Sequence, residues 1–319
     1  MSKLKPVYSL SISGRMTLEL HSLNNEGGEG NQTMTRTVTL VDQEGGIHKV
    51  NAISGDMFKH IQAEHFYRLA RERGLPLCAG CQTFRSDRIL GDNNFIQNLP
   101  DRDEEAVTAL LNRCALDDAE GTLIAKGARS IPRKSVAEFG WVVGLPDKVR
   151  TESYFHVRYA QERGGEGEDS QSQPIFHRPA SSGIYAAIAT FELARIGFND
   201  ISQTYAVTEE ERLRRYQTFM ESVLYTFIEP NGAMRGTQNP HIVAFDGVIT
   251  VSHAVLPAPT ISPLGDGYKE QVLQVAQALD PTGELLKVYL FASMAEFATT
   301  MRRIIVESRP YLLFAENGG

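Results

Sequence analysis

The sequence contains few cysteines, no excess of positive charge and no long apolar run. Three cysteines in 319 residues, one of them necessarily unpaired, argue against a disulfide framework and predict a reducing, cytoplasmic location. A net charge of −7 gives no general attraction to nucleic acid, so any such site must be local. No run of about eighteen apolar residues could span a bilayer. The first residues also lack the apolar segment of a signal peptide, and we expect no membrane partner.

Common catalytic motifs are also missing. The chain has no G-x-S-x-G, no H-E-x-x-H, no Walker loop and no G-x-G-x-x-G between a strand and a helix. Gly27-Gly-Glu-Gly30 is glycine-rich but lacks the Lys-Ser/Thr that ends a phosphate-binding loop. The sequence therefore predicts a protein that is not an enzyme.

An alternating pattern marks the first strand. From Leu10 to Leu20 the even positions are apolar or glycine, whereas the odd positions are Ser, Ser, Arg, Thr and Glu. Alternation with a period of two is typical of a strand with one buried face and one polar face. We predict that the polar face is a binding surface.

The rest of the chain alternates between strand and helix patterns. We predict a strand over 33–41, joined to the first by a loop over 24–31 and able to pair with it, and a helix that begins near Ser54. Residues 183–197 are compatible with helix or strand, and strand is favoured. The capping pattern at Thr208 opens another helix. Further predicted elements are a helix over 103–116, hairpin arms 153–159 and 175–178 around a low-complexity tip, strands 242–251 and 285–291, and helices 268–279 and 295–306. This set fits an α+β domain of the split βαβ kind.

The cysteines form two short motifs with metal-ligand spacing. Cys78-x₂-Cys81 is followed by Cys114-x₂-Asp117. Two C-x₂-C knuckles supply four thiolates to tetrahedral zinc, and an aspartate can occupy one position. The alternative is three reduced, partly buried thiols. The sequence requires no cofactor. The one metal that these motifs could bind is a structural zinc ion.

Basic and polar residues beside the predicted strands could follow a phosphate backbone. Scattered charges can equally be a solvated surface with salt bridges. Two polar clusters, 22–25 and 237–239, favour nucleic acid, because Asn, Ser, Thr and Gln contact phosphate and 2′-hydroxyls without adding charge. The basic candidates are Arg15, Lys59, Arg129, Arg133, Lys134, Arg178 and Arg235.

Several longer motifs follow one another in the chain: Ser11-Ile-Ser-Gly-Arg15, His21-Ser-Leu-Asn-Asn-Glu-Gly27, Thr35-Arg36, Asn51-Ala-Ile-Ser-Gly-Asp-Met-Phe-Lys-His60, Arg129-Ser-Ile-Pro-Arg-Lys-Ser135 and Phe139-Gly-Trp-Val-Val143. In this order they resemble the DevR-type backbone subunit of type I CRISPR interference complexes (Cascade), closest to the I-B subtype. The resemblance implies a modified RRM-like (ferredoxin-like) palm with a helical finger insertion and a thumb β-hairpin. The implied boundaries are 1–62 and 179–319 for the palm, 63–150 for the fingers and 151–178 for the thumb.

The implied function is a non-catalytic scaffold that holds the backbone of a guide RNA (crRNA) for pairing with target DNA. Its implied partners are crRNA, target DNA, other copies of itself, which stack into an open filament, and other Cascade subunits. The RNA-binding candidates are Ser13, Arg15, His21, Asn24, Asn25, Arg36, Asn51, Ser54, Lys59, Arg129, Arg133, Lys134, Arg178, Arg235, Gln238 and Asn239.

Two other functions are compatible with the resemblance. A ribonuclease for the guide precursor would need histidines or paired acids near the RNA, and His21, His60 and His241 are placed for that role. A transcriptional autoregulator has no helix-turn-helix pattern to support it. The chain also departs from the family at Cys114-x₂-Asp117, where a second C-x₂-C often occurs, and its first strand lacks the stacking aromatics of a true RRM.

Overall fold

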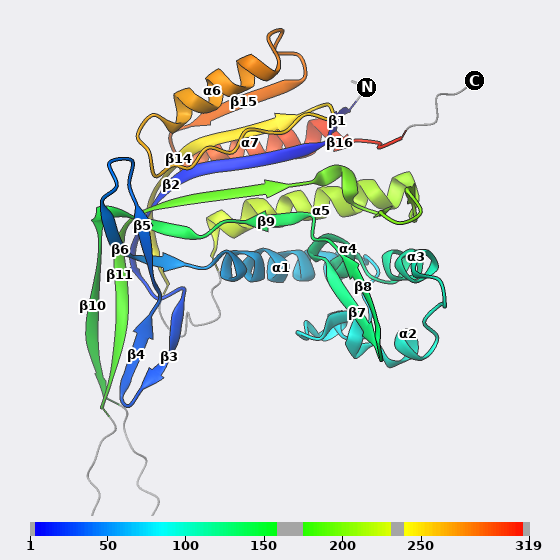
Figure 1. Cartoon of the computed structure of the whole chain (residues 1–319), viewed down its shortest axis with the longest axis horizontal. Helices are drawn as coiled ribbons and strands as arrows, with labels where there is room; N and C mark the ends of the chain where they lie inside the picture. Colours follow the sequence, from blue (N-terminus) through cyan, green and yellow to red (C-terminus); the bar gives the residue numbers. More distant parts are fainter. Residues whose placement is uncertain (1–3, 158–174, 231–238, 315–319) are drawn as a thin grey trace, which may run out of the picture.

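The computed structural model describes residues 4–157, 175–230 and 239–314 and is organised around one twisted sheet (Figure 1). The strand order is β15-β14-β2-β11-β10-β6-β5. The interior strand β2 runs antiparallel to both neighbours, with Ser13 opposite Ile188 on one side and Val248 on the other. The strands of this path are β2 (Ser9–His21), β5 (Thr37–Val41), β6 (Ile47–Ile53), β10 (Val142–Val157), β11 (Ile175–Phe191), β14 (His241–Ser252) and β15 (Leu286–Phe291).

The predicted first strand is present, but its predicted partner is not. Residues 33–41 divide at Arg36 into β4 (Gln32–Thr35) and β5, and neither pairs with β2. The expected loop forms β3 (Asn25–Glu29), which pairs with β4, while β5 pairs with β6. β-Branched alternation fits any antiparallel neighbour. The pattern therefore indicates a strand without indicating its partner.

Three helices, α1 (Gly55–Glu72), α5 (Glu209–Ile228) and α7 (Met294–Glu307), cover one face of the sheet (Figure 1). The predicted helix start near Ser54 and the predicted cap at Thr208 are confirmed, because both hydroxyls accept hydrogen bonds from backbone N–H groups, those of Met57 and Glu211. The core beneath the helices consists of the even residues of β2 and the odd residues of β11 and β14. The favoured strand over 183–197 is confirmed as far as Phe191.

The opposite face of the sheet is covered by the chain that follows β14. Residues 253–267 cross β2, as the contact of Pro259 with Ser11 shows, and α6 (Tyr268–Leu279) packs on Val248. β1 (Lys5–Val7) pairs in parallel with β16 (Ser308–Pro310). Among the helices in the described ranges, none combines the length and apolar composition that a membrane crossing requires.

The segment between α1 and β9 (Ala137–Phe139) folds into short elements at the far end of α1 (Figure 1). The predicted helix over 103–116 divides at Cys114, which caps a second helix. The elements are η1 (Cys81–Thr83), η2 (Arg88–Gly91), α2 (Asn93–Gln97), α3 (Asp103–Arg113), α4 (Ala115–Glu120), β7 (Thr122–Lys126) and β8 (Arg129–Arg133). After β11 come η3 (Leu193–Arg195), β12 (Phe198–Asn199) and β13 (Thr204–Tyr205).

The predicted hairpin is formed by the distal halves of β10 and β11, which pair as far as Val157 opposite Ile175. It projects from the sheet beside β3 and β4 (Figure 1). The predicted tip lies outside the described residues. The domain boundaries at 62, 150 and 178 remain predictions.

Candidate functional site

The polar face of β2 is covered over its first half. Ser9, Ser11 and Ser13 are each at most 3% exposed. The Ser11 hydroxyl donates to the carbonyl oxygen of Pro259 at 2.9 Å. Ser13 is buried, and its hydroxyl has no hydrogen-bond partner in the part of the chain that the structure describes. This burial contradicts the prediction that Ser13 binds RNA.

Arg15 marks the edge of the covered region. Its Nε donates to the carbonyl oxygen of Pro263 and its Nη2 to the Asp266 carboxylate, both at 2.8 Å. The guanidinium also lies 5.6 Å from the centre of the Tyr268 ring. Arg15 therefore fastens the covering segment to the strand. Beyond it the same face opens, since Thr17 and Glu19 are partly exposed.

Four predicted RNA-binding residues meet at the N-terminus of α1, and we call Asn24, Arg36, Asn51 and Ser54 the Ser54 cluster. The Asn24 Oδ1 accepts from the Ser54 N–H at 3.1 Å and from its hydroxyl at 3.0 Å. The Asn51 Nδ2 donates to the Arg36 carbonyl oxygen at 3.0 Å. Asn24, Asn51 and Ser54 are all buried. The Asn51 side chain and the Asn24 carbonyl oxygen position the Arg36 backbone. The burial of the other three residues leaves the Arg36 side chain as the member suited to contact a ligand.

Sequence reasoning missed Trp141, although it lies beside this cluster. The Arg36 guanidinium is 5.3 Å from the centre of the Trp141 ring, and the tryptophan is 43% exposed. Gly140 precedes it because a Cβ there would lie 2.5 Å from the Ile188 side chain. The available signal was the only tryptophan of the chain, in a motif that was used only for the resemblance.

His21 lies inside the protein. It packs edge-on against Tyr185 with ring centroids 4.9 Å apart, and neither ring nitrogen has a hydrogen-bond partner within residues 4–157, 175–230 and 239–314. Burial lowers the pKa of His21 to about 4, so the ring is neutral at neutral pH. Lys59 of α1 is half-buried, and burial lowers its pKa below the ordinary value.

A second predicted group lies at the base of the hairpin. A pocket of about 260 Å³ is lined by Leu20, Tyr154, Ala180, Asn239 and His241, and we call it the hairpin-base pocket. Arg178 is exposed and lies opposite Tyr154 in the β10–β11 pairing.

Three predicted RNA contacts cannot be placed. Arg235 and Gln238 lie outside the described residues. The backbone of Asn25 lies in β3 opposite Thr35, and its side chain is not among those described.

Arg133 is the clearest departure from the predicted site. Its side chain is fully buried. All three guanidinium nitrogens donate hydrogen bonds, to acceptors that include the Asp118 carboxylate at 2.8 Å and the Arg195 carbonyl oxygen at 2.7 Å. This burial contradicts the prediction that Arg133 binds RNA, because no donor is left for a phosphate.

The other two basic residues of the insertion lie at its surface in ion pairs. Arg129 pairs with Asp103 at 2.7 Å, and the Lys134 ammonium lies 3.1 Å from the Glu192 carboxylate. Arg129 begins β8 and pairs with α3, whereas Lys134 follows β8 and also pairs with Glu138 of β9 at 3.3 Å. The structure thus gathers some predicted contacts near the hairpin and separates others from it.

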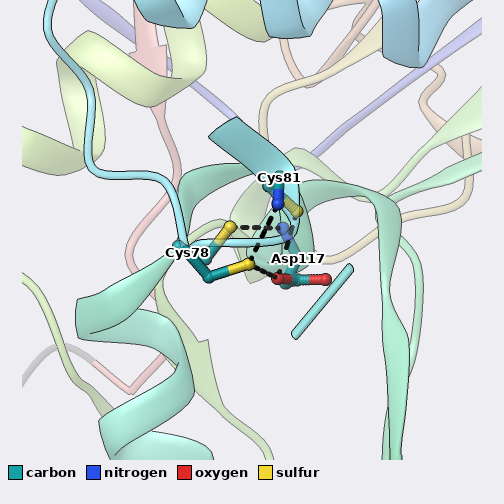
Figure 2. Close-up of side chains that lie close together, drawn as sticks. Cys78, Cys81 and Asp117 are labelled. Carbon is teal, nitrogen blue, oxygen red and sulfur yellow. Dashed lines mark hydrogen bonds between the residues drawn. The ribbon is translucent and has the colours of Figure 1, made fainter. Parts of the chain in front are cut away.

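The predicted metal ligands are brought together. One ligand atom from each of Cys78, Cys81, Cys114 and Asp117 lies within 4.8 Å of the others, and all four residues are buried. Figure 2 shows Cys78, Cys81 and Asp117 converging on one point. The Cys78 and Cys81 sulfurs are 3.3 Å and 3.5 Å from the Asp117 Oδ2. Burial raises the pKa of Asp117 well above its ordinary value.

The sequence is similar to one protein family and to individual proteins of known type. A family model described as "CRISPR-associated negative auto-regulator DevR/Csa2" matches residues 12–273. The chain is 24% identical over 286 residues to the CRISPR-associated protein Cas7/Cst2/DevR of Methanocaldococcus jannaschii, which covers 84% of this chain and 87% of the relative. It is 22% identical over 290 residues to the CRISPR-associated protein Cas7/Csa2 1 of Saccharolobus solfataricus. That alignment covers 88% of this chain and 89% of the relative.

Solved structures give more distant similarities. A chain of a CRISPR RNA-guided surveillance complex, pre-nicking, aligns with a TM-score of 0.48 and 12% identity over 93% of this chain and 99% of that chain. Csc2 of Thermofilum pendens aligns with a TM-score of 0.41 and 12% identity, and the alignment covers 95% of this chain and 87% of Csc2.

Proposed function

Because the chain belongs to the DevR/Csa2 family of CRISPR-associated proteins, we propose that it is a guide-RNA-binding backbone subunit of a type I Cascade complex, close to the I-B subtype. It holds the sugar-phosphate backbone of the crRNA while base pairing with target DNA supplies sequence specificity. Its partners are the crRNA, target DNA, further copies of itself in an open filament and other Cascade subunits. Its role is that of a scaffold and includes no catalytic step.

The strand order supports an RRM-like palm in this proposal. In a split β-α-β-β-α-β unit, the helices follow the first and third strands. Here α1 comes after β2, with β3 to β6 between them in the chain, and α5 comes after β11. β14 and β11 flank β2 on its two sides. The helical segment over 63–150 then corresponds to the fingers, and the β10–β11 hairpin corresponds to the thumb.

The observation that carries the proposal is the exposed Trp141 ring beside Arg36 at the N-terminus of α1. Bases stack on aromatic rings without regard to sequence, and arginine binds phosphate. The N-terminus of an eighteen-residue helix adds partial positive charge at the same place. Together these groups suit a nucleic-acid strand held by its backbone and by one stacked base.

Residues on either side of this point extend the surface. Lys59 lies one turn along α1 from Ser54, and Arg178 and the hairpin-base pocket lie at the end of β2. Asn239 and His241 of the pocket offer polar groups for sugar and phosphate contacts. The RNA therefore runs past the N-terminus of α1 toward the base of the hairpin.

The histidines favour a scaffold over a ribonuclease. His21 is buried with a pKa lowered to about 4, so it cannot donate a proton at neutral pH. His60 packs against Phe84 with ring centroids 5.5 Å apart. His241 is exposed at the hairpin-base pocket and is the residue on which ribonuclease activity would depend. Incubation of the guide-RNA precursor with the protein, in EDTA and in divalent metal, should leave the precursor RNA intact.

The test measures binding of a short single-stranded RNA of mixed sequence at one fixed salt concentration. Trp141→Ala should weaken binding by about 1–3 kcal/mol, which is about 5- to 150-fold in affinity, because a stacked base is lost. Trp141→Phe should retain most of the affinity. Arg36→Ala should weaken binding and reduce the salt dependence by about one phosphate contact.

Arg303 offers a matched control for Arg36. Its guanidinium lies 5.1 Å from the centre of the Tyr289 ring and it is exposed on α7. Arg303→Ala removes the same charge and the same kind of ring contact, and it should leave RNA binding unchanged. Equal affinities for Trp141→Ala, Arg36→Ala and the unmodified protein would overturn the proposed site. A duplex DNA that competes better than the RNA would favour the autoregulator.

A further inference from the structure

The insertion contains a buried set of four ligand atoms contributed by two short turns. Cys78 and Cys81 lie in the turn that leads into η1, while Cys114 caps α4 and Asp117 lies in its first turn. Each pair is separated by two residues, yet the pairs are more than thirty residues apart in the chain. All four residues are buried and the three cysteines are free thiols. The fold therefore brings two separate metal-ligand motifs to one point.

The spacing of the ligand atoms fits a single metal ion. Zinc bonds to sulfur at about 2.3 Å and to carboxylate oxygen at about 2.0–2.2 Å, so a sulfur and an oxygen on one tetrahedral zinc are about 3.5 Å apart. The Asp117 Oδ2 lies 3.3 Å from the Cys78 sulfur and 3.5 Å from the Cys81 sulfur. An iron–sulfur cluster would hold its ligands farther apart, because they bind different irons.

The backbone around the sulfurs is arranged to support thiolates. The Cys81 N–H points to the Cys78 sulfur and the Asp117 N–H points to the Cys114 sulfur, both at 3.4 Å. The same three-residue relation thus occurs once in each turn. Hydrogen bonds to ligand atoms orient them and stabilise their negative charge.

Asp117 supplies a second, independent indication of a cation. Its side chain has no solvent exposure, and its Oδ1 has no hydrogen-bond partner among the described residues. The nearby Arg113 pairs with Asp92 at 3.0 Å. Arg88 acts on Asp117 only through its charge and donates to the Gly121 carbonyl oxygen. Among the described residues the buried carboxylate therefore has no ion-pair partner to compensate its charge. A bound metal ion would provide that compensation.

We propose that Cys78, Cys81, Cys114 and Asp117 bind one structural zinc ion. All four tetrahedral positions are occupied by protein ligands and the site is buried, which is typical of structural zinc rather than catalytic zinc. Zinc accepts mixed sulfur and oxygen ligands because it imposes no geometric preference of its own. This inference is independent of the proposed RNA binding.

The next residue explains what such an ion would stabilise. Asp118 is buried and accepts hydrogen bonds from Arg133 at 2.8 Å, from Arg215 of α5 at 3.0 Å and from the Gly197 N–H at 2.9 Å. Consecutive residues of α4 therefore face the metal site and the network that joins the insertion to α5. Zinc would fix α4 and so maintain the contact between the insertion and the sheet domain.

The test begins with the unmodified full-length chain, produced with zinc in the medium and purified under reducing conditions without chelator. Elemental analysis should find one zinc ion per chain. Protein loaded with cobalt(II) in its place should show sulfur-to-metal charge-transfer absorption and the intense visible bands of a tetrahedral site. Removal of the metal should lower the unfolding temperature.

Variants separate ligands from neighbours. Asp117→Cys should keep one metal ion per chain, and Asp117→Ala should lose it or hold it more weakly. Asp92→Asn is the matched control, since Asp92 is an equally buried carboxylate of the insertion that already has Arg113 and the Ala79 N–H as partners. It should retain the metal. A zinc-free chain that also fails to bind cobalt would overturn the proposal, and so would stoichiometric iron.

Discussion

The two halves of β2 carry the same alternating pattern but have different surroundings. In the first half, Ser9, Ser11 and Ser13 are almost fully buried, and Ser11 contacts Pro259 of the covering segment 253–267. In the second half, Thr17 and Glu19 are partly exposed and Leu20 is 46% exposed at the hairpin-base pocket. Arg15 separates the halves by binding Pro263 and Asp266. The difference shows that a polar strand face becomes a binding surface only where no other part of the chain covers it.

The covering segment also changes the role of the polar residues. Ser11, which looks like a ligand contact in the sequence, holds the sheet to a segment nearly 250 residues away through its hydrogen bond to Pro259. Arg15, which looks like a phosphate contact, closes that layer. The proposed RNA site consequently moves to the end of the strand, beside Trp141 and the hairpin.

The largest expected effect is a difference in unfolding free energy between substitutions in the two halves of β2. Ser11→Asp places a carboxylate in a buried site opposite the Pro259 carbonyl oxygen, and it should lower the free energy of unfolding by about 3 kcal/mol or more. Thr17→Asp makes the same change to a side chain on the same strand face but in the open half, and it should cost less than about 1 kcal/mol. Urea unfolding measures both. Equal losses of unfolding free energy would mean that the polar face is equally buried in both halves of β2.

A smaller effect on stability tests whether His21, at the end of β2, is buried. Burial lowers the pKa of His21 from 6.5 to about 4, so the folded state binds its proton less readily than the unfolded state. Stability should therefore fall as pH falls from 6.5 to about 4, by about 3 kcal/mol in total. His21→Phe retains a ring against Tyr185 and should remove this part of the pH dependence. Parallel pH profiles for the two proteins would show that His21 is not buried.

Local features of the fold could be predicted from the sequence because they depend on neighbouring residues. The alternation of β2, the caps at Ser54 and Thr208 and the two cysteine turns each need only a few consecutive positions. The pairing of 33–41 and the cover over Ser11 could not be predicted, since they join distant segments.

The candidate site shows the same limit. Arg133 appeared to be one of a basic exposed group, but β8 places it on the same face as the buried Ile131. That alternation was available in the sequence and was overlooked. Trp141 gave no such pattern, because its importance depends on Arg36 and α1 coming beside it.

The most direct test of the central claim maps RNA contacts on the unmodified protein. A complex with single-stranded RNA is cross-linked with ultraviolet light, and mass spectrometry identifies the peptides that carry nucleotides. Adducts should occur at Trp141 and Tyr154, next to the Ser54 cluster and the hairpin-base pocket, and not on residues 9–13 beneath the covering segment. Adducts on residues 9–13 or 259–266, with none at Trp141 or Tyr154, would contradict the proposed RNA path.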